Sequence, residues 1–288
     1  MEQKPVAGHE ALAQPDADIA QRFLDEADAV AQRRERTIDR RALAWLQIAN
    51  TGILAVYLLV FATQLRADGG LAQVLVFAFL VWGQLSSGMA QRWGMQRRLT
   101  RAHWPLILGG GVLLAAVLVL MFAAVFVPSF PVLPLYASVG LLALGFGGYA
   151  AAGLIRARRD PRPPVAPSAP LDRAARWGTI LVGVTFGALT ALAAAPEDVL
   201  RTVLLLLVVL GVAVWLFASD TEIGLSEIGA VWRWPHVVAV AVAGVALVGV
   251  VMLDLGARGL SSVGVSLGAV VLVLFVAVSF AQGHPRRG

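Results

Sequence analysis

Residues 156–177 read RARRDPRPPVAPSAPLDRAARW, and this stretch decides how the rest of the chain is organised. It holds six arginines and five prolines, and long apolar segments lie on both sides of it. A helix cannot run through these prolines, because each lacks a backbone donor and its ring clashes with the preceding turn. So many guanidinium groups also cannot lie within hydrocarbon. The stretch is therefore predicted to be a solvated linker between two halves of a membrane protein.

The composition of the chain is typical of a protein that crosses a membrane several times. Of its 288 residues 58% are hydrophobic and 14% are charged, and the mean hydropathy is +0.76. Soluble domains carry about 25% charged residues. The apolar residues occur in blocks of about 20, which is long enough to cross a hydrocarbon core of about 30 Å.

The apolar blocks predict eight membrane-spanning helices. The second is the most polar, because Gln84, Ser86 and Ser87 interrupt it, and the third and fourth are joined by a tight connection. The predicted spans are Leu43–Leu65, Leu71–Ala90, Pro105–Val127, Val132–Ile155, Trp177–Ala195, Val199–Ala218, His236–Leu255 and Ser262–Ala281.

The predicted fold is all-α, with eight transmembrane helices in two four-helix units joined by a Pro/Arg-rich cytoplasmic linker. The chain is thereby divided into an N-terminal cytoplasmic helical segment (residues 1–42), the first four-helix unit (43–155), the linker (156–176), the second four-helix unit (177–281) and a cytoplasmic tail (282–288).

The distribution of basic residues predicts the orientation. Of the 23 lysines and arginines, all but Arg66, Arg201 and Arg258 fall on one side of the predicted spans. Basic residues are retained on the cytoplasmic side of a membrane, so both termini and the linker are predicted to be cytoplasmic. Lys4 is the one lysine, a bias that fits a GC-rich bacterial genome, and we therefore expect the plasma membrane of a bacterium.

The arginines beside the predicted spans are expected to contact anionic lipid headgroups on the cytoplasmic side. These are Arg33, Arg34, Arg36, Arg40, Arg41, Arg97, Arg98, Arg101, Arg156, Arg158 and Arg159. The net charge of +5 is explained by basic residues that lie beside membrane spans, so we expect no nucleic-acid partner.

The N-terminal segment carries one narrow apolar stripe at helical spacing, formed by Ile19, Phe23, Ala27 and Val30. Such a stripe could dock on a protein partner or on the membrane surface. The third alternative is a solvated helix that extends the first span into the cytoplasm.

Polar side chains interrupt the first two spans at matching depth. Asn50 and Gln84 each lie about 10 Å from the inner interface, at a rise of about 1.5 Å per residue. We therefore predict direct contact between these two helices through amide hydrogen bonds. The alternative is a polar lining open to the cytoplasm. The residues concerned are Gln47, Asn50, Thr51, Gln84 and Ser87.

Two further patterns concern packing. Small residues recur at intervals of four, as at Gly183 and Gly187 and again at Gly264 and Gly268, and they predict close helix contacts. Between the sixth and seventh spans, an apolar face at helical spacing predicts a short helix lying along the inner surface of the membrane; it contains Leu225, Ile228, Val231 and Trp232.

No pattern in the sequence indicates catalysis or a cofactor. The four histidines are scattered, there is no cysteine, and no Asp, Glu, Lys, Arg or His lies near the middle of a predicted span. The last point argues against a proton-coupled transporter. We therefore expect a non-enzymatic structural, assembly or regulatory membrane protein without metal or cofactor. The alternative is a permease, or the membrane subunit of a transporter, for a small or lipid-like solute.

The predicted orientation can be tested with reporter fusions. A fusion at residue 165 and fusions at both termini should be active with a cytoplasmic reporter such as green fluorescent protein, and inactive with alkaline phosphatase. A fusion at residue 257 should show the opposite pattern and serves as the control. Phosphatase activity at residue 165, or termini on opposite sides, would contradict the prediction.

Overall fold

A computed structural model describes residues 19, 21–26, 29, 38–66, 71–94, 104–127, 130–160, 171–196, 198–218, 221, 224–256 and 258–280. The chain divides into two compact units, Met1–Ile38 and Asp39–Gly288. In the first unit, residues 19, 21–26 and 29 are helical, and the side chains of Ile19 and Phe23 are exposed. Residues 161–170 of the predicted linker lie outside the described residues. So do six of the arginines predicted to contact headgroups, namely Arg33, Arg34, Arg36, Arg97, Arg98 and Arg101.

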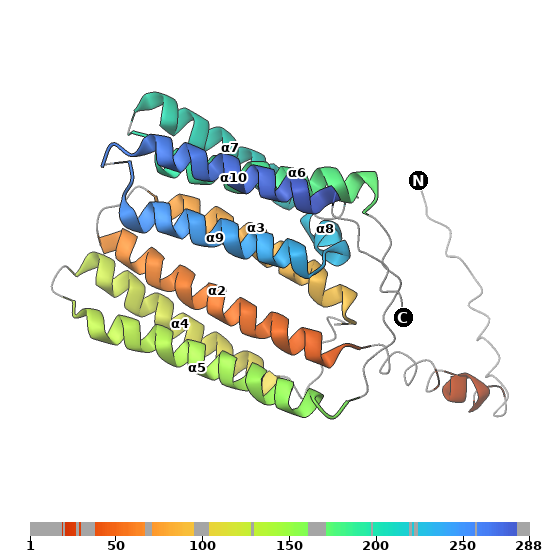
Figure 1. Cartoon of the computed structure of the whole chain (residues 1–288). Coiled ribbons are helices and arrows are strands. Elements are labelled where there is room, and N and C mark those ends of the chain that lie inside the picture. Colours follow the sequence, from red (N-terminus) through yellow and green to blue (C-terminus); the bar gives the residue numbers. More distant parts are fainter. Residues whose placement is uncertain are drawn as a thin grey trace, which may run out of the picture. The chain divides into compact units, whose positions relative to one another are not determined.

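The described part of the second unit consists of helices and their connections, with no strand (Figure 1). The bounds of the long helices lie within about one turn of the predicted spans. The helices are α2 (Arg40–Arg66), α3 (Ala72–Arg92), α4 (Trp104–Phe126), α5 (Val132–Ala157), α6 (Arg173–Ala193), α7 (Val199–Phe217), α8 (Leu225–Val231), α9 (Trp234–Leu253) and α10 (Ser261–Phe280).

Seven of these helices are long and apolar enough to cross a membrane, namely α2, α3, α5, α6, α7, α9 and α10. In α4 the corresponding described stretch, Leu108–Ala124, is shorter. Large apolar side chains are exposed on the outside of the bundle, including Leu207, Leu210 and Phe217 of α7. An apolar outer surface of this extent is suited to contact with lipid. The chain is thus an all-helical protein with the dimensions of a multispanning membrane protein.

Aspartate side chains fix the beginnings of three helices. The Oδ1 atoms of Asp39, Asp172 and Asp198 accept hydrogen bonds from backbone N–H groups three residues further on, at 2.9, 2.8 and 2.6 Å. Each carboxylate satisfies a donor that has no partner within the helix and lies at the positive end of the helix dipole. These caps set the start of α2, α6 and α7.

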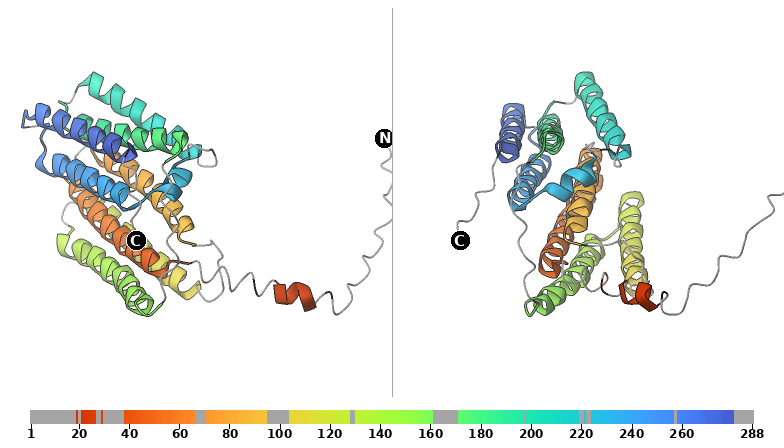
Figure 2. Two further views of the ribbon diagram at one scale, coloured as in Figure 1. Left: turned by 45° about the vertical axis from the view of Figure 1, so that its right-hand side comes forward. Right: turned by 90° about the vertical axis from the view of Figure 1, so that its right-hand side faces the viewer.

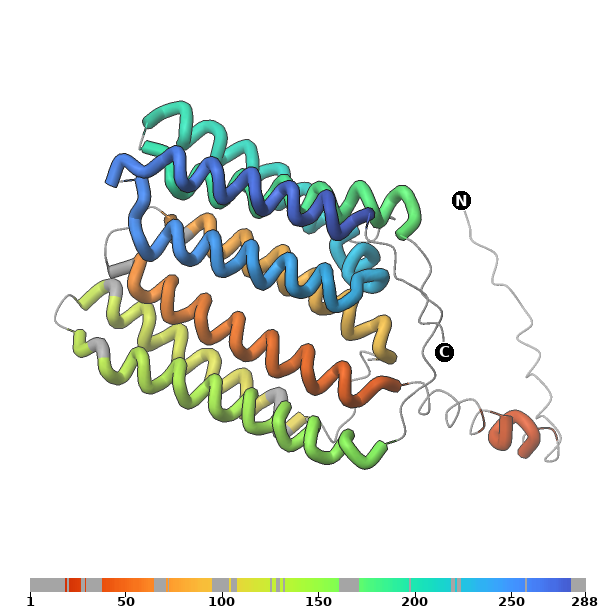
Figure 3. The backbone as a smooth tube through the Cα atoms, in the orientation of Figure 1, coloured from red at the N-terminus to blue at the C-terminus, as the bar shows by residue number. Residues whose placement is uncertain are grey.

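Successive long helices run in opposite directions (Figure 3). At one end of the bundle α2, α6 and α9 begin and α3 and α5 end. The described arginines at this end are Arg40, Arg41, Arg92, Arg156, Arg158, Arg159, Arg173, Arg176 and Arg233, whereas Arg66, Arg201 and Arg258 lie at the other. We call it the arginine end.

The helices of the two halves share one core. α3 packs against α6, α7, α8 and α9 as well as against α2, and Figure 2 shows it between the two groups of helices. Its Val81 and Leu85 belong to the same buried cluster as Phe186 and Leu247 of the second half. A smaller cluster joins α2, α4 and α5 around Leu142. The linker therefore does not separate two independent packing units.

The short helix α8 is buried more deeply than a helix lying along a membrane surface. Leu225, Ile228 and Trp232 are fully buried, whereas Val231 is exposed. Gly229 brings the backbone of α8 against that of α3, where an added Cβ would overlap the carbonyl of Leu85. The indole of Trp232 donates to Thr179 Oγ1 of α6 at 2.9 Å. α8 is thus packed against both α3 and α6.

α6 and α10 form the most extensive helix contact in the described part of the chain, and they touch through the predicted small residues. A Cβ added to Gly187 would lie 2.7 Å from the carbonyl oxygen of Gly268, and a Cβ added to Gly268 would lie 2.5 Å from that of Gly187. Both groups are backbone and cannot move away as a flexible side chain can. The absence of two Cβ atoms is what lets these helices meet.

Substituting either glycine with alanine should separate α6 from α10. We expect Gly187→Ala and Gly268→Ala each to destabilise the protein by about 1–3 kcal/mol through overpacking, measured as thermal unfolding in detergent. The control is Gly211→Ala in α7, where an added Cβ meets nothing within 4 Å. It should leave stability unchanged or raise it by up to about 1 kcal/mol, because alanine favours helix. Equal effects at all three positions would contradict the close contact.

Candidate functional site

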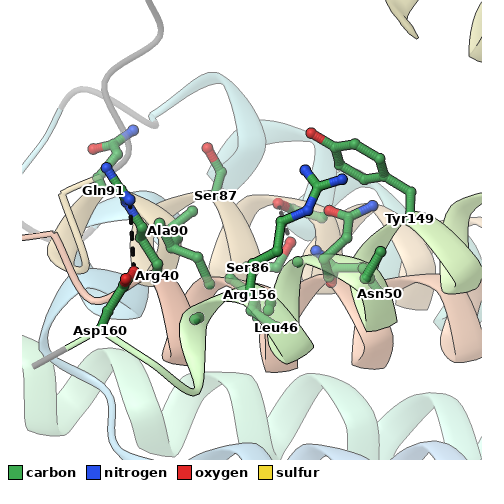
Figure 4. Close-up of a pocket in the computed structure, with 18 residues that line it drawn as sticks. Arg40, Leu46, Asn50, Ser86, Ser87, Ala90, Gln91, Tyr149, Arg156 and Asp160 are labelled. Atoms are coloured by element: carbon green, nitrogen blue, oxygen red, sulfur yellow. Dashed lines mark hydrogen bonds and ion pairs between the residues drawn. The ribbon is translucent and has the colours of Figure 1, made fainter. Parts of the chain in front are cut away.

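A pocket of about 690 Å³ opens at the arginine end between α2, α3 and α5 (Figure 4). α2 packs against both neighbours, whereas α3 and α5 make little direct contact with each other. The space between α3 and α5 is therefore left open above α2. Polar side chains from all three helices line it, namely Arg40, Gln47, Asn50, Ser86, Ser87, Gln91, Tyr149, Arg156 and Asp160.

The charges at the mouth leave one cation without a counter-charge. Arg40 Nη1 lies 3.5 Å from Asp160 Oδ2, and both side chains are partly exposed, at 59% and 42%. Such a pair contributes little to stability, but it engages the one carboxylate in the lining. The guanidinium group of Arg156 has no hydrogen-bond or ion-pair partner among the described residues, and Figure 4 shows it extending into the pocket on the side of Tyr149. The lining thus carries a net positive charge.

Backbone contacts hold the three helix ends around the mouth. Arg41 Nη2 donates to the carbonyl oxygen of Arg158 at 3.3 Å, which ties the start of α2 to the end of α5. The backbone N–H of Asp39 donates to the carbonyl oxygen of Trp93 at 3.2 Å, which ties the start of α2 to the end of α3. The position of the pocket is therefore set by its rim and by the packing of α2.

The hydrogen bond between α2 and α3 is made by an amide and an indole. Trp82 Nε1 donates to Asn50 Oδ1 at 2.9 Å, and Trp82 is almost completely buried. The two helices contact each other, but the structure pairs Asn50 with Trp82 and not with Gln84. Thr51 Oγ1 donates within its own helix, to the carbonyl oxygen of Gln47 at 2.8 Å.

A smaller pocket of about 240 Å³ adjoins the first further along α2, and we call the two together the cavity, with the smaller as its deeper part. The two parts share Gln47, Asn50, Gly83 and Ser86. Beyond these residues the deeper part is mainly apolar, and its further lining is Thr51, Leu54, Phe79, Trp82 and Phe146. The cavity therefore changes from polar and basic at its mouth to apolar at depth.

The residues singled out from the sequence take different places in this geometry. Gln47, Asn50 and Ser87 line the polar part, and Thr51 lines the deeper part. Gln84 lines neither part. Sequence reasoning did not find the contribution of α5, whose Tyr149 and Arg156 complete the pocket. Arg156 was noted in the sequence together with Arg158 and Arg159, but all three were predicted to contact lipid headgroups only.

A second pocket lies on the opposite side of α2. It has a volume of about 430 Å³, and side chains of α2, α3, α6 and α9 line it, including Val56, Phe79 and Val245. No charged side chain lines it. A site of this character offers no group that could orient a polar ligand, so it is a weaker candidate than the first pocket.

Two basic groups near α8 have a structural role. Arg92 Nη1 donates to the carbonyl oxygens of Val231 and Trp232, at 3.1 and 2.7 Å, where α8 ends. His236 is buried beside the ring of Trp232, and its Nδ1 accepts from the backbone N–H of Arg233. In the described part of the chain, no three His, Cys, Asp or Glu side chains converge as metal ligands.

Comparison with known proteins finds no match: no family model, no curated protein and no solved structure is similar to this chain. The described residues define the class, a helical protein with seven helices among them that are long and apolar enough to cross a membrane. The function therefore has to be argued from the pocket between α2, α3 and α5.

The pairing of Asn50 with Trp82 can be separated from a pairing with Gln84 by double-mutant cycles. Asn50→Ala and Trp82→Phe should be coupled by about 0.5–2 kcal/mol in unfolding free energy, because each removes the same buried hydrogen bond. Asn50→Ala and Gln84→Ala should be additive, which makes this pair the matched control. Coupling in the second cycle and additivity in the first would contradict the structure.

Proposed function

We propose that this chain is a non-enzymatic membrane protein that binds a ligand from the cytoplasmic side and acts as a regulatory or assembly partner. The observation that supports this proposal is the pocket between α2, α3 and α5, which is basic at its mouth and becomes apolar at depth. Most of the polar lining groups are amides and hydroxyls, and the guanidinium group of Arg156 has no partner among the described residues, an arrangement that suits binding. A protein partner for the N-terminal segment is part of the same proposal.

The proposal includes an orientation in the membrane. We infer that α4 is the eighth span, since it packs along α5 and runs for 23 residues. Eight spans return the chain to its starting side, and the crowding of arginines at one end then makes that end cytoplasmic. The inferred location is the plasma membrane of a bacterium, with both termini and residues 156–176 in the cytoplasm.

A permease is the second candidate. It is favoured by the depth of the pocket, because Thr51 and Leu54 lie 11 and 14 positions beyond Arg40 along α2. At about 1.5 Å per residue this places the deep end about 17–21 Å from the start of the helix. A site reaching toward the middle of the membrane is the location expected of a transported solute.

Cysteine accessibility tests the proposal directly, because the natural chain has no cysteine. Gln47→Cys and Ser87→Cys line the pocket. In inverted membrane vesicles, which expose the cytoplasmic face, both thiols should react with a membrane-impermeant maleimide. The control is Ser279→Cys, which is buried near the arginine end of α10 and should react only after unfolding.

The sidedness of the reaction distinguishes the two candidates. Reaction only from the cytoplasmic face supports a binding protein, whereas reaction of the same thiols in right-side-out vesicles supports a permease with alternating access. Pocket thiols that stay as unreactive as the one at position 279 would overturn the proposed function.

A further inference from the structure

We propose that the ligand of this pocket is an anionic amphiphile, a phospholipid whose headgroup binds at Arg156 and whose acyl chain lies in the apolar part beyond Asn50. This inference rests on the proposed function, because it requires the pocket to be open at the arginine end. It goes beyond the headgroup contact predicted for Arg156 from the sequence, because it places both the headgroup and the acyl chain of one lipid in a defined cavity.

Two groups that face the pocket, the amide of Asn50 and the guanidinium group of Arg156, are available as donors. The side-chain oxygen of Asn50 accepts the hydrogen bond from the indole of Trp82. The side-chain NH₂ group of Asn50 is therefore the part of the amide that is available to the pocket. The one lining carboxylate, Asp160, is engaged by Arg40. The guanidinium group of Arg156 adds a cation without a partner among the described residues. Donors and a cation together select a ligand with several acceptor oxygens and a negative charge, such as a phosphodiester.

The deeper part of the cavity suits an alkyl chain and not a second polar group. Leu54, Phe79 and Phe146 line it, and the indole N–H of Trp82 is already bonded to Asn50. A purely ionic ligand would fill the mouth and leave this apolar volume to water or empty. A ligand with a chain fills both parts and removes the apolar lining from water.

The order of these groups along the bundle matches a lipid in a leaflet. Arg40 and Arg156 lie at the helix ends, where the headgroup region of a membrane would be, and the apolar lining lies further along α2 and α5. The gap between α3 and α5 gives a chain a lateral route into the cavity without unfolding either helix. A lipid of the inner leaflet therefore needs no reorientation in order to bind.

Gly83 provides a variant that fills the cavity without disturbing the fold. It lines both parts of the pocket, and an added Cβ would meet nothing within 4 Å. Gly88 on the same helix is packed against the backbone of α8 and is unsuitable. Gly83→Leu should therefore occupy the space of the acyl chain, and Gly211→Leu in α7, which also faces open space, is its matched control.

The experiment measures lipid retained by the purified full chain in detergent, with phosphatidylglycerol as the probe and phosphatidylcholine as the uncharged reference, counted by native mass spectrometry. Arg156→Gln should reduce affinity for phosphatidylglycerol by about tenfold or more, as expected for loss of a charge-assisted hydrogen bond. Arg158 is exposed and does not line the pocket. Arg158→Gln should therefore change the affinity for phosphatidylglycerol by less than about twofold, because an exposed charge contributes little. Gly83→Leu should reduce binding, and Gly211→Leu should not.

Inorganic phosphate and glycerol phosphate distinguish a lipid from a free anion. Neither should displace phosphatidylglycerol, because neither fills the apolar part. Displacement by either ion at concentrations comparable to the lipid, or equal retention of phosphatidylcholine, would overturn this inference. If the lipid inference fails in either way but the pocket thiols still react from the cytoplasmic face, the proposed function is retained. If the thiols do not react, both the proposed function and the lipid inference are overturned.

Discussion

Hydrocarbon cannot solvate a guanidinium group, and the described arginines of this chain accordingly lie at helix ends. Most of them gather at the end where α2 begins and α5 ends. That constraint brings Arg40 and Arg156 to the rim of one pocket, although they are far apart in the sequence. Because antiparallel helices return the chain to the same end of the bundle, arginines that are kept at helix ends for reasons of solvation come together there and form a basic site.

Small residues divide the bundle into closely packed and open parts. Gly187 and Gly268 let α6 and α10 meet backbone to backbone, and Gly88 and Gly229 do the same for α3 and α8. Close packing of this kind is the main source of helix association in lipid, where the hydrophobic effect is absent. Gly83, on another face of α3, meets no neighbour. One helix thus serves as part of the core on one side and as the wall of a cavity on the other.

The hydrogen bond between Trp82 and Asn50 links stability to the chemistry of the pocket. A buried indole N–H needs an acceptor, and the amide oxygen supplies it. The amide is then oriented with its donor toward the cavity. The same contact that joins α2 to α3 therefore makes the mouth richer in donors, and it fixes where the polar lining gives way to Leu54 and Phe79.

The sequence by itself determined the helices and their ends, because apolar length, aspartate caps and proline positions are local properties. It also determined that most arginines fall on one side. Beyond the contact between the first two spans, it did not determine which helices touch. Apolar helices are hydrophobic on nearly every face, so hydropathy does not specify a partner. Only the tertiary structure placed α3 among the helices of the second half, buried α8, chose Trp82 over Gln84 as the partner of Asn50, and brought Arg156 into a pocket. Each of these outcomes depends on side-chain shapes that meet across distant segments.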